Sequence, residues 1–239
     1  MNAPLVSVLM AARNAASTLD RQVECVLGQR GVSLELLMCD DASTDATFDR
    51  MRRHASDPRV RILRNRSRLH AAATRNRLLA LARGRYCSPC DADDLLMPDA
   101  LSSLAASLEA HPRAGLAYGT LIQVFTEPRR NVTPRIIAAG RPGWDLFAHH
   151  ASHAGSVIRT RLLREVGGYD PGLRLAEDRD LFLKLRERAE FVALPGLLTY
   201  VWRVHPRSSG RIRRDRHRII EGILRRAAER RLKLGLDGL

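Results

Sequence analysis

The sequence lacks an apolar run long enough to cross a membrane, since no uninterrupted stretch reaches the roughly 18 residues of a spanning helix. Its N-terminus, residues 1–4, has no basic segment ahead of the short apolar stretch that follows, which argues against a signal peptide. Four cysteines in 239 residues are too few for a disulfide framework. These absences predict a soluble, cytoplasmic protein.

The composition is that of a globular protein with an excess of positive charge. Hydrophobic residues make up 45% of the chain, enough for a sizeable core, and 239 residues favour a single large domain. Lys and Arg exceed Asp and Glu by 40 to 26, and residues 203–239 alone hold 12 basic and 4 acidic residues. This basic tail indicates either an anionic partner, such as nucleic acid, anionic lipid or a phosphorylated substrate, or a solvated helix face.

The first half alternates between short apolar runs and segments with helical periodicity. Such alternation predicts parallel strand–helix–strand units, and hence an α/β fold with a mostly parallel sheet. Ligands of such sheets bind outside the carboxyl ends of the strands. The expected strands are residues 6–11, 34–39, 60–63, 86–90 and 115–124, and the expected helices are residues 19–27, 45–54, 71–82 and 101–108.

The second half of the sequence is less regular. Residues 127–143 are rich in Pro, Gly and Arg and are predicted to form a surface loop, and residues 144–206 contain shorter elements. Residues 211–234 have apolar positions along one side and arginines along the other, which predicts one amphipathic helix. No internal repeat or flexible linker separates the halves, so we expect one compact body.

Three carboxylates follow the fourth expected strand. Asp91, Asp93 and Asp94 lie within four residues, where their charges repel one another. A divalent cation removes that repulsion, and oxygen ligands suit Mg²⁺ or Mn²⁺, which in turn favours a phosphorylated ligand. The alternative is a turn whose aspartate caps the helix after Pro98. The position at a strand end favours the functional interpretation.

A second acidic pair, Asp40 and Asp41, stands in the same place after the second strand. Its carboxylates can accept hydrogen bonds from a nucleobase imide or a ribose hydroxyl. Ser43, Thr44 and Asp45, which follow, are typical of the capped first turn of a helix. Both interpretations can hold, with the first two residues functional and the other three structural.

Taken in order, these segments resemble the family-2 glycosyltransferases. The resemblance covers roughly residues 5–210 and implies a GT-A-type fold, a mostly parallel sheet flanked by helices. It also implies inverting transfer of a sugar from a nucleotide-diphosphate sugar to an acceptor hydroxyl. The matching segments are residues 6–10 with Asn14, residues 40–45, residues 84–86 leading into 91–94 and 98–99, residues 166–170, residues 177–181, and Tyr200 with Arg203, His205 and Ser208.

The resemblance further implies roles for individual residues. Asp178 would be the general base that takes the proton from the acceptor hydroxyl. Asp93 and His205 would bind a Mg²⁺ or Mn²⁺ ion that stabilises the departing diphosphate. Glu177 would contact the acceptor. His153 follows His149 by four residues and could hold a metal, but no carboxylate completes a set, so we expect it to contact the acceptor from an acceptor-side loop. The donor would be bound by Ala12, Asn14, Asp40, Asp41, Arg75 and Asp91.

Several of these residues also have simpler structural interpretations. Arg75 fits a solvated helix residue, and His205 fits an exposed histidine among arginines. Glu177 and Asp178 fit negative charges in the first turn of a helix.

Two cysteines have the spacing of a metal or redox site. Cys87 and Cys90 lie on an expected strand, where residues three apart point to opposite faces. No second cysteine pair lies nearby to complete a zinc site. We therefore expect two separate, buried thiols.

The sequence departs from the family pattern near the expected donor site. Arg13 lies within Ala-Ala-Arg-Asn where the family commonly has Pro-Thr-Tyr-Asn, so a guanidinium replaces an aromatic ring that could stack on the base. Ala42 and His70 stand where the family usually or often has glycine. The Gln-x-x-Arg-Trp motif of processive synthases is absent, which favours addition of a single sugar.

We therefore expect a catalytic domain at residues 1–210, with a nucleotide-binding half (1–125) and an acceptor half (126–210), followed by a basic helix (211–239). The expected acceptor is a glycan or a lipid-linked glycan in cell-surface polysaccharide or glycolipid synthesis. The helix could lie peripherally on the anionic inner face of a membrane, pack on the body, or form a homodimer. Nucleic acid is not expected, because no aromatic residue lies among its arginines.

Two other functions were compatible with parts of the sequence. A sugar-phosphate nucleotidyltransferase usually needs a Gly-rich phosphate loop after the first strand, and residues 11–16 lack one. A non-enzymatic module could bind nucleic acid or anionic lipid through the basic tail.

Overall fold

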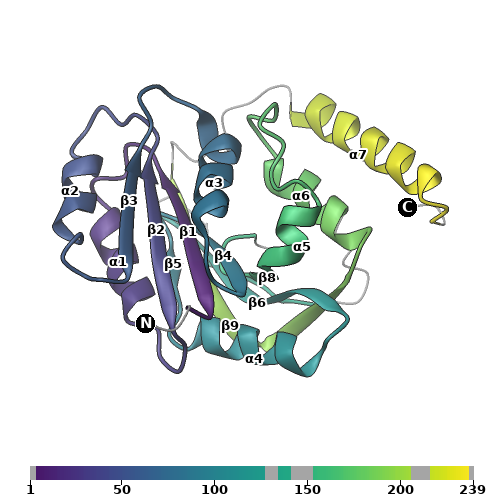
Figure 1. The fold of residues 1–239 in the computed structure, drawn as a ribbon, viewed down its shortest axis with the longest axis horizontal. Helices are drawn as coiled ribbons and strands as arrows, with labels where there is room; N and C mark the ends of the chain where they lie inside the picture. Colours follow the sequence, from purple (N-terminus) through teal and green to yellow (C-terminus); the bar gives the residue numbers. More distant parts are fainter. Residues whose placement is uncertain (1–3, 127–133, 141–152, 206–215, 237–239) are drawn as a thin grey trace.

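The computed structural model describes residues 4–126, 134–140, 153–205 and 216–236. Within them, one sheet has the strand order β3-β2-β1-β4-β8-β6-β9-β5, and β7 pairs with β6 beside that path. Figure 1 shows α1 and α2 on one side of the N-terminal strands and α3 on the other. The chain is thus an α/β protein in which helices flank a single curled sheet, as the periodicity predicts.

The N-terminal part of the sheet is wholly parallel. Its four strands alternate with helices, so the predicted strand–helix–strand units are confirmed. The strands are β1 (Val6–Ala12), β2 (Leu34–Asp40), β3 (Val60–Arg64) and β4 (Tyr86–Asp91). The helices are α1 (Leu19–Leu27), α2 (Thr47–Arg53) and α3 (His70–Leu81).

The rest of the sheet is mixed. Strand β8 is antiparallel to both β4 and β6, and β9 runs parallel to β6. The strands are β5 (Leu95–Leu96), β6 (Ala114–Phe125), β7 (Arg135–Ile137), β8 (Val157–Arg159) and β9 (Glu190–Val204). The helices are α4 (Ala100–Ala110), α5 (Thr160–Glu165) and α6 (Glu177–Arg186).

Two elements differ from the sequence-based expectation. The loop predicted at residues 127–143 is wrong for Arg135–Ile137, because this short segment pairs with β6. Strand β9 was not predicted, because Pro195 and Gly196 in its middle are typical of a turn. The structure accommodates them as a bulge, where the register jumps from Leu194 to Leu198, and Thr120 Oγ1 donates to the Pro195 carbonyl at 2.7 Å.

Alternate residues of each strand feed two apolar layers. Helices α1 and α4 pack on one face of the sheet, and α3, α5 and α6 pack on the other. Cys90 belongs to the first layer and Cys87 to the second, so the prediction of two separate, buried thiols is confirmed. Burial raises the pKa of Cys87 to about 11, which keeps this thiol protonated and unreactive.

Helix α7 (Arg216–Lys233) packs against α6. Ile223 and Ala227, both fully buried, meet Leu183, and Arg230 pairs with Glu187 at 3.0 Å. Of the three fates considered for the C-terminal helix, packing on the body is therefore observed (Figure 1, yellow). In the part of the chain that the structure describes, no helix combines the length and the apolar character that crossing a bilayer requires.

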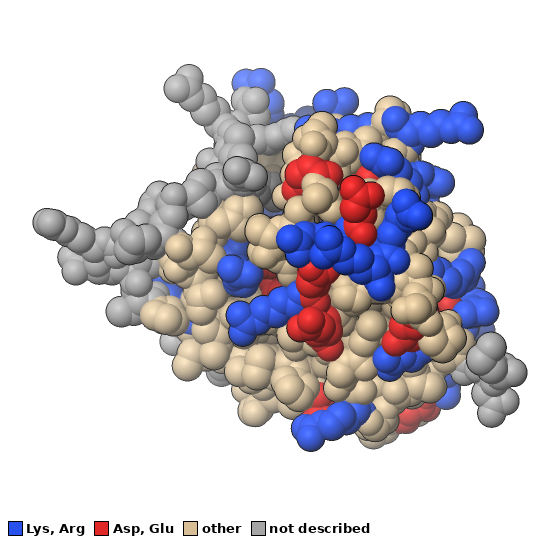
Figure 2. Space-filling view, turned by 90° about the vertical axis from the view of Figure 1, so that its left-hand side faces the viewer, with Lys and Arg blue, Asp and Glu red and all other residues tan. Residues whose placement is uncertain are grey.

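Positive charge is also concentrated outside the tail. Residues 50–85 contain 12 arginines and one acidic residue, Asp57. Most of these arginines are exposed, on α2, on β3 and around α3. Figure 2 shows this side of the molecule, with basic side chains spread over it and acidic ones between them. Because β3 is an edge strand of the sheet, exposed charges on it discourage pairing with a second chain.

The packing of α7 can be tested with two apolar truncations. Replacing Ile223, which is fully buried, with Ala should lower the free energy of unfolding by about 2 kcal/mol, because it removes most of a small apolar contact. The control, Leu232→Ala, lies on the same helix at 77% exposure and should change it by less than about 0.5 kcal/mol. Urea unfolding measures both, and equal effects of the two variants would contradict the docking of α7.

Candidate donor and catalytic site

The carboxyl ends of β1, β2 and β4 lie side by side and carry most of the predicted donor residues. Ala12 is in register with Asp40, and Ala11 is in register with Asp91. The backbone of Asp41 is fixed as well, since its N–H donates to the Ala12 carbonyl at 2.8 Å. The parallel sheet thus brings together three segments that are far apart in the sequence, at the edge where ligands of such sheets bind.

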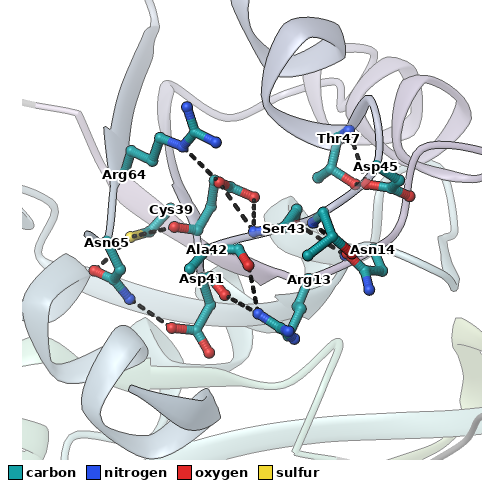
Figure 3. Close-up of polar contacts among 12 residues, drawn as sticks. Arg13, Asn14, Cys39, Asp41, Ala42, Ser43, Asp45, Thr47, Arg64 and Asn65 are labelled. Carbon is teal, nitrogen blue, oxygen red and sulfur yellow. Dashed lines mark hydrogen bonds and ion pairs between the residues drawn. The ribbon is translucent and has the colours of Figure 1, made fainter. Parts of the chain in front are cut away.

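The two aspartates at the end of β2, Asp40 and Asp41, have different surroundings, and Figure 3 shows Asp41 beside Asn65. Asp40 is fully buried, and its carboxylate accepts hydrogen bonds from the backbone N–H of Ser43 at 3.3 Å and from Arg64 Nε at 3.1 Å. Asp41 accepts hydrogen bonds from the side-chain amide of Asn65 at 2.7 Å and from two backbone N–H groups at the start of α3, those of residues 69 and 70. These contacts tie Asp41 to the start of α3, so its side chain supports the loop that follows β2.

Asn14 joins the loop after β1 to the loop after β2. Its side-chain oxygen accepts a hydrogen bond from the Thr44 backbone N–H at 2.9 Å, and its own N–H donates to Ser43 Oγ at 3.0 Å. Asp45 lies just before α2 and accepts from the Thr47 N–H at 3.0 Å. The capping interpretation is wrong as made, because Ser43 and Thr44 bond to Asn14 and the cap residue of α2, Ala46, makes no side-chain hydrogen bond. The sequence motif 40–45 thus combines a carboxylate at the sheet edge with structural contacts.

Arg75 lies at the centre of the site. Its side chain is only 6% exposed, and it donates to Asp91 Oδ1 at 2.6 Å and to Glu177 Oε1 at 2.8 Å. Burial opposes the charged form, but the two carboxylates prevail and raise the pKa of Arg75 above its usual value. The interpretation of Arg75 as a solvated helix residue is therefore wrong. It links the end of β4 to the start of α6.

Tyr169 contacts Arg75, and His153 in turn contacts Tyr169. The guanidinium carbon of Arg75 is 5.6 Å from the centre of the Tyr169 ring, and the Tyr169 hydroxyl is hydrogen-bonded to His153 Nε2 at 2.6 Å. His153 is 5% exposed, and burial lowers its pKa well below 6.5, so it is neutral. This is a supporting position, and the contact of His153 with an acceptor stays a prediction.

The acidic residues after β4 point in different directions. Asp93 Oδ2 lies 2.8 Å from His205 Nε2, whereas Asp94 accepts a hydrogen bond from the Arg203 backbone N–H at 2.7 Å. Burial and the charge of Asp91 raise the pKa of Asp93. The helix-capping alternative is not observed, since α4 begins after Asp99 and no side chain caps it.

The pair Asp93 and His205 suits a divalent cation that completes its coordination with a ligand. No group of three or more His, Cys, Asp or Glu side chains converges in the described ranges. Mg²⁺ and Mn²⁺ commonly take one or two protein ligands, carboxylates among them, and share a substrate diphosphate. The donor set therefore fits the metal that the sequence implies.

Glu177 and Asp178 open α6, as the helix-charge interpretation expects. Asp178 Oδ1 accepts a hydrogen bond from the Arg179 N–H at 2.8 Å. Burial raises the pKa of Asp178 above its ordinary 3.8, although Arg75 opposes the shift. A carboxylate with a raised pKa is a stronger base, which is what removal of a hydroxyl proton needs.

Comparison with known proteins agrees with this geometry. Two solved structures share the fold of the GT-A transferases: TarS residues 1–349 of S. aureus in complex with UDP-GlcNAc, and the mannosyltransferase PcManGT of Pyrobaculum calidifontis in complex with GDP-Man and Mn²⁺. The TM-scores are 0.76 and 0.69 at 17% and 21% identity. The match to TarS covers 94% of this chain and 65% of that chain, and the match to PcManGT covers 100% and 66%. At this identity they establish the fold alone.

The sequence profile of glycosyl transferase family 2 matches residues 7–167, and the chain belongs to this family. EpsE of Bacillus subtilis, itself assigned to the glycosyltransferases only provisionally, is 32% identical over 98% of this chain and 85% of its own length. Other relatives are much longer: the chain spans 23% of one uncharacterised protein and 19% of a chondroitin synthase.

The sequence left Tyr169 and Arg64 without a role. Tyr169 lies in a segment that carried the resemblance, but only the structure shows its ring beside Arg75. Arg64 ends β3 and pairs with Asp40 across 24 positions of sequence. No local signal could identify either contact, because both depend on the packing of separate elements.

Removing the buried Arg75 guanidinium should lower the free energy of unfolding in a pH-dependent way. Without Arg75, the carboxylate of Glu177 loses its partner, so its pKa in the folded state, already raised by burial, rises further. A carboxyl group with a raised folded pKa favours folding at low pH and loses that contribution as the pH rises through the folded value. We expect Arg75→Met to cost about 3 kcal/mol at pH 8 and less at pH 5.

Thermal unfolding at the two pH values measures this effect. A loss of about 3 kcal/mol corresponds to a drop of roughly 6–12 °C in a protein of this size. Arg52→Met, at an exposed position on α2, is the matched control and should change little. An equal loss for Arg75→Met at both pH values would show that the unpaired carboxylate is not the cause.

Proposed function

We propose that this chain transfers a single sugar, with inversion, from a nucleotide-diphosphate sugar to an acceptor hydroxyl. The observation that carries the proposal is the arrangement around Arg75. Its two ion pairs hold the end of β4, next to the Asp93–His205 pair, against the start of α6, where Asp178 lies. The proposed site for a metal-bound diphosphate thus faces the partly buried Asp178 carboxylate, whose pKa is raised.

In this mechanism, different residues bind different parts of the donor. Ala12, Asn14, Asp40 and Asp41 form the end that receives the nucleoside, and Asp91 lies toward the ribose. Asp93 and His205 would hold a divalent cation, which would supply positive charge for the departing diphosphate. The donor-binding half corresponds to residues 1–125.

The acceptor lies on the side of α6. Asp178 takes the proton from the acceptor hydroxyl as its oxygen attacks the anomeric carbon from the face opposite the leaving diphosphate. Glu177 faces Arg75 and contributes to the acceptor side of the site. Residues 126–210 form the acceptor half, although residues 127–133, 141–152 and 206–210 lie outside the described residues.

A glycan acceptor in cell-surface polysaccharide or glycolipid synthesis is supported by the likeness to a chondroitin synthase. Membership of the glycosyltransferase family favours sugar transfer over the nucleotidyltransferase and over a binding module without enzymatic activity. Contact with an anionic membrane through α7 stays a prediction. It is compatible with exposed Arg225, Lys233 and Leu232 on the side of α7 that does not pack on α6.

Metal-dependent donor binding is the first consequence to test. At about 100 times its dissociation constant, a nucleoside diphosphate stabilises the folded protein by about 2.7 kcal/mol, or roughly 5–10 °C. Thermal unfolding with UDP, GDP, dTDP or CDP, each with and without Mn²⁺, should give such a shift for at least one nucleotide only when the metal is present. Asp93→Ala should abolish it. A shift that survives in Asp93→Ala would contradict the metal assignment.

The role of Asp178 predicts a separation of binding from chemistry. Asp178→Asn should lower the transfer rate by about 10²–10⁴-fold and leave nucleotide affinity unchanged. Because only the ionised base acts and burial raises its pKa, the rate of the parent enzyme should fall on acidification at a pH above the ordinary 3.8 of aspartate. The control, Asp170→Asn, alters a partly exposed carboxylate and should retain transfer. Full activity of Asp178→Asn would exclude it as the base.

A further inference from the structure

Arg13 holds the loop that follows β2 (Figure 3). Its Nη1 donates to the backbone carbonyl of Asp41 at 2.8 Å and to that of Ala42 at 2.5 Å. These two carbonyls belong to the peptide groups on either side of the Ala42 Cα. One guanidinium nitrogen therefore fixes both peptide orientations that define the backbone conformation of Ala42.

Ala42 needs such a restraint. Its φ is +53°, in the left-handed region that glycine adopts readily and that a residue with a Cβ avoids. An alanine in this conformation persists only when its surroundings enforce it. The contacts of Arg13 supply that enforcement from the end of β1, across the gap between two adjacent loops.

The conformation of Ala42 controls the geometry of the proposed nucleoside site. The next residue, Ser43, directs its N–H to the Asp40 carboxylate at 3.3 Å, and its Oγ accepts a hydrogen bond from the Asn14 N–H. A rotation about the Ala42 backbone would turn Ser43 and break both contacts. Asp40 would then lose one of the donors that orient its carboxylate.

We propose that Arg13 is a positioning residue for donor binding. By gripping the two carbonyls beside Ala42, it holds residues 40–44 in the form that receives the nucleoside, and so sets the affinity for the nucleotide part of the donor. This inference rests on the proposed function. It assigns Arg13 a contact with the protein backbone in place of the stacking contact with the base that its sequence position suggests.

The test is a double-mutant cycle that joins Arg13→Ala with Ala42→Gly. The dissociation constants of UDP, GDP, dTDP and CDP in the presence of Mn²⁺ are measured by calorimetry for the full chain, and those that bind are measured for each variant. Arg13→Ala should weaken binding about tenfold, because the loop is no longer held. Ala42→Gly alone should change it less than about threefold, since glycine tolerates this φ.

The double variant separates positioning from direct contact. Because glycine removes the strain that Arg13 offsets, Arg13→Ala with Ala42→Gly should recover most of the lost affinity. If the Arg13 guanidinium contacted the nucleotide itself, a change at position 42 could not replace that contact. If Arg13 only stabilised the fold, Ala42→Gly would not restore the nucleotide affinity. Arg52→Ala, an exposed arginine on α2, is the matched control and should bind as the parent does.

Each outcome decides one point. Unchanged affinity in Arg13→Ala would overturn the inference, as would a double variant that binds as weakly as Arg13→Ala alone. Failure of the parent protein to bind any of these four nucleotides would instead count against the proposed function, and with it the role of Arg13. The parent titration therefore distinguishes the two failures.

Discussion

The pairing of Arg75 with Asp91 and Glu177 is the interaction on which the site depends. A buried charge is tolerated only when its partners are fixed at hydrogen-bonding distance, and here the partners come from the end of β4 and the start of α6. The ion pairs therefore set the separation between the sheet edge and the helix that carries Asp178. Without the Arg75 guanidinium, the carboxylates of Asp91, Glu177 and Asp178 would face one another across the same space, and their repulsion would move them apart.

Asp93 and Asp94, the other two carboxylates of the acidic motif that follows β4, are held by different contacts. The backbone N–H of Arg203 holds Asp94, and His205 lies against Asp93, so both are fixed by residues 203–205 at and just beyond the end of β9. Only Asp93 is left beside His205, the second proposed metal ligand. A cluster that would be costly as three free charges thus becomes one ion pair with Arg75, one hydrogen-bonded support and one half of the proposed metal site. The length of β9, interrupted by its bulge, makes this division possible.

The sequence predicts the parallel half of the sheet well, because its alternation of apolar runs and helical segments is a local signal. It places the predicted carboxylates correctly at strand ends, since register follows from strand direction. It fails where distant elements meet. Arg75 pairs with residues 16 and 102 positions away, so its burial leaves no local trace, and a helix of mixed composition is equally typical of a solvated arginine. The sequence does not predict strand β9, because Pro195 and Gly196 are typical of a turn, whereas in the structure they lie in a bulge within the strand.

Backbone strain is concentrated in loops that lead into helices, most of them around the proposed donor and catalytic sites. Among the described residues, the non-glycine positions with positive φ are Asn14, Ala42, His70, Asp99 and Ala176. Each lies in a loop that leads into a helix, or at the first residue of one. Such conformations persist only when surrounding contacts enforce them, and they are most useful where loops must hold a fixed shape before a ligand arrives. The family often has glycine at two of these positions. This chain keeps side chains there, so the fixed shape must come from cross-loop contacts such as those of Asn14 and Asp41.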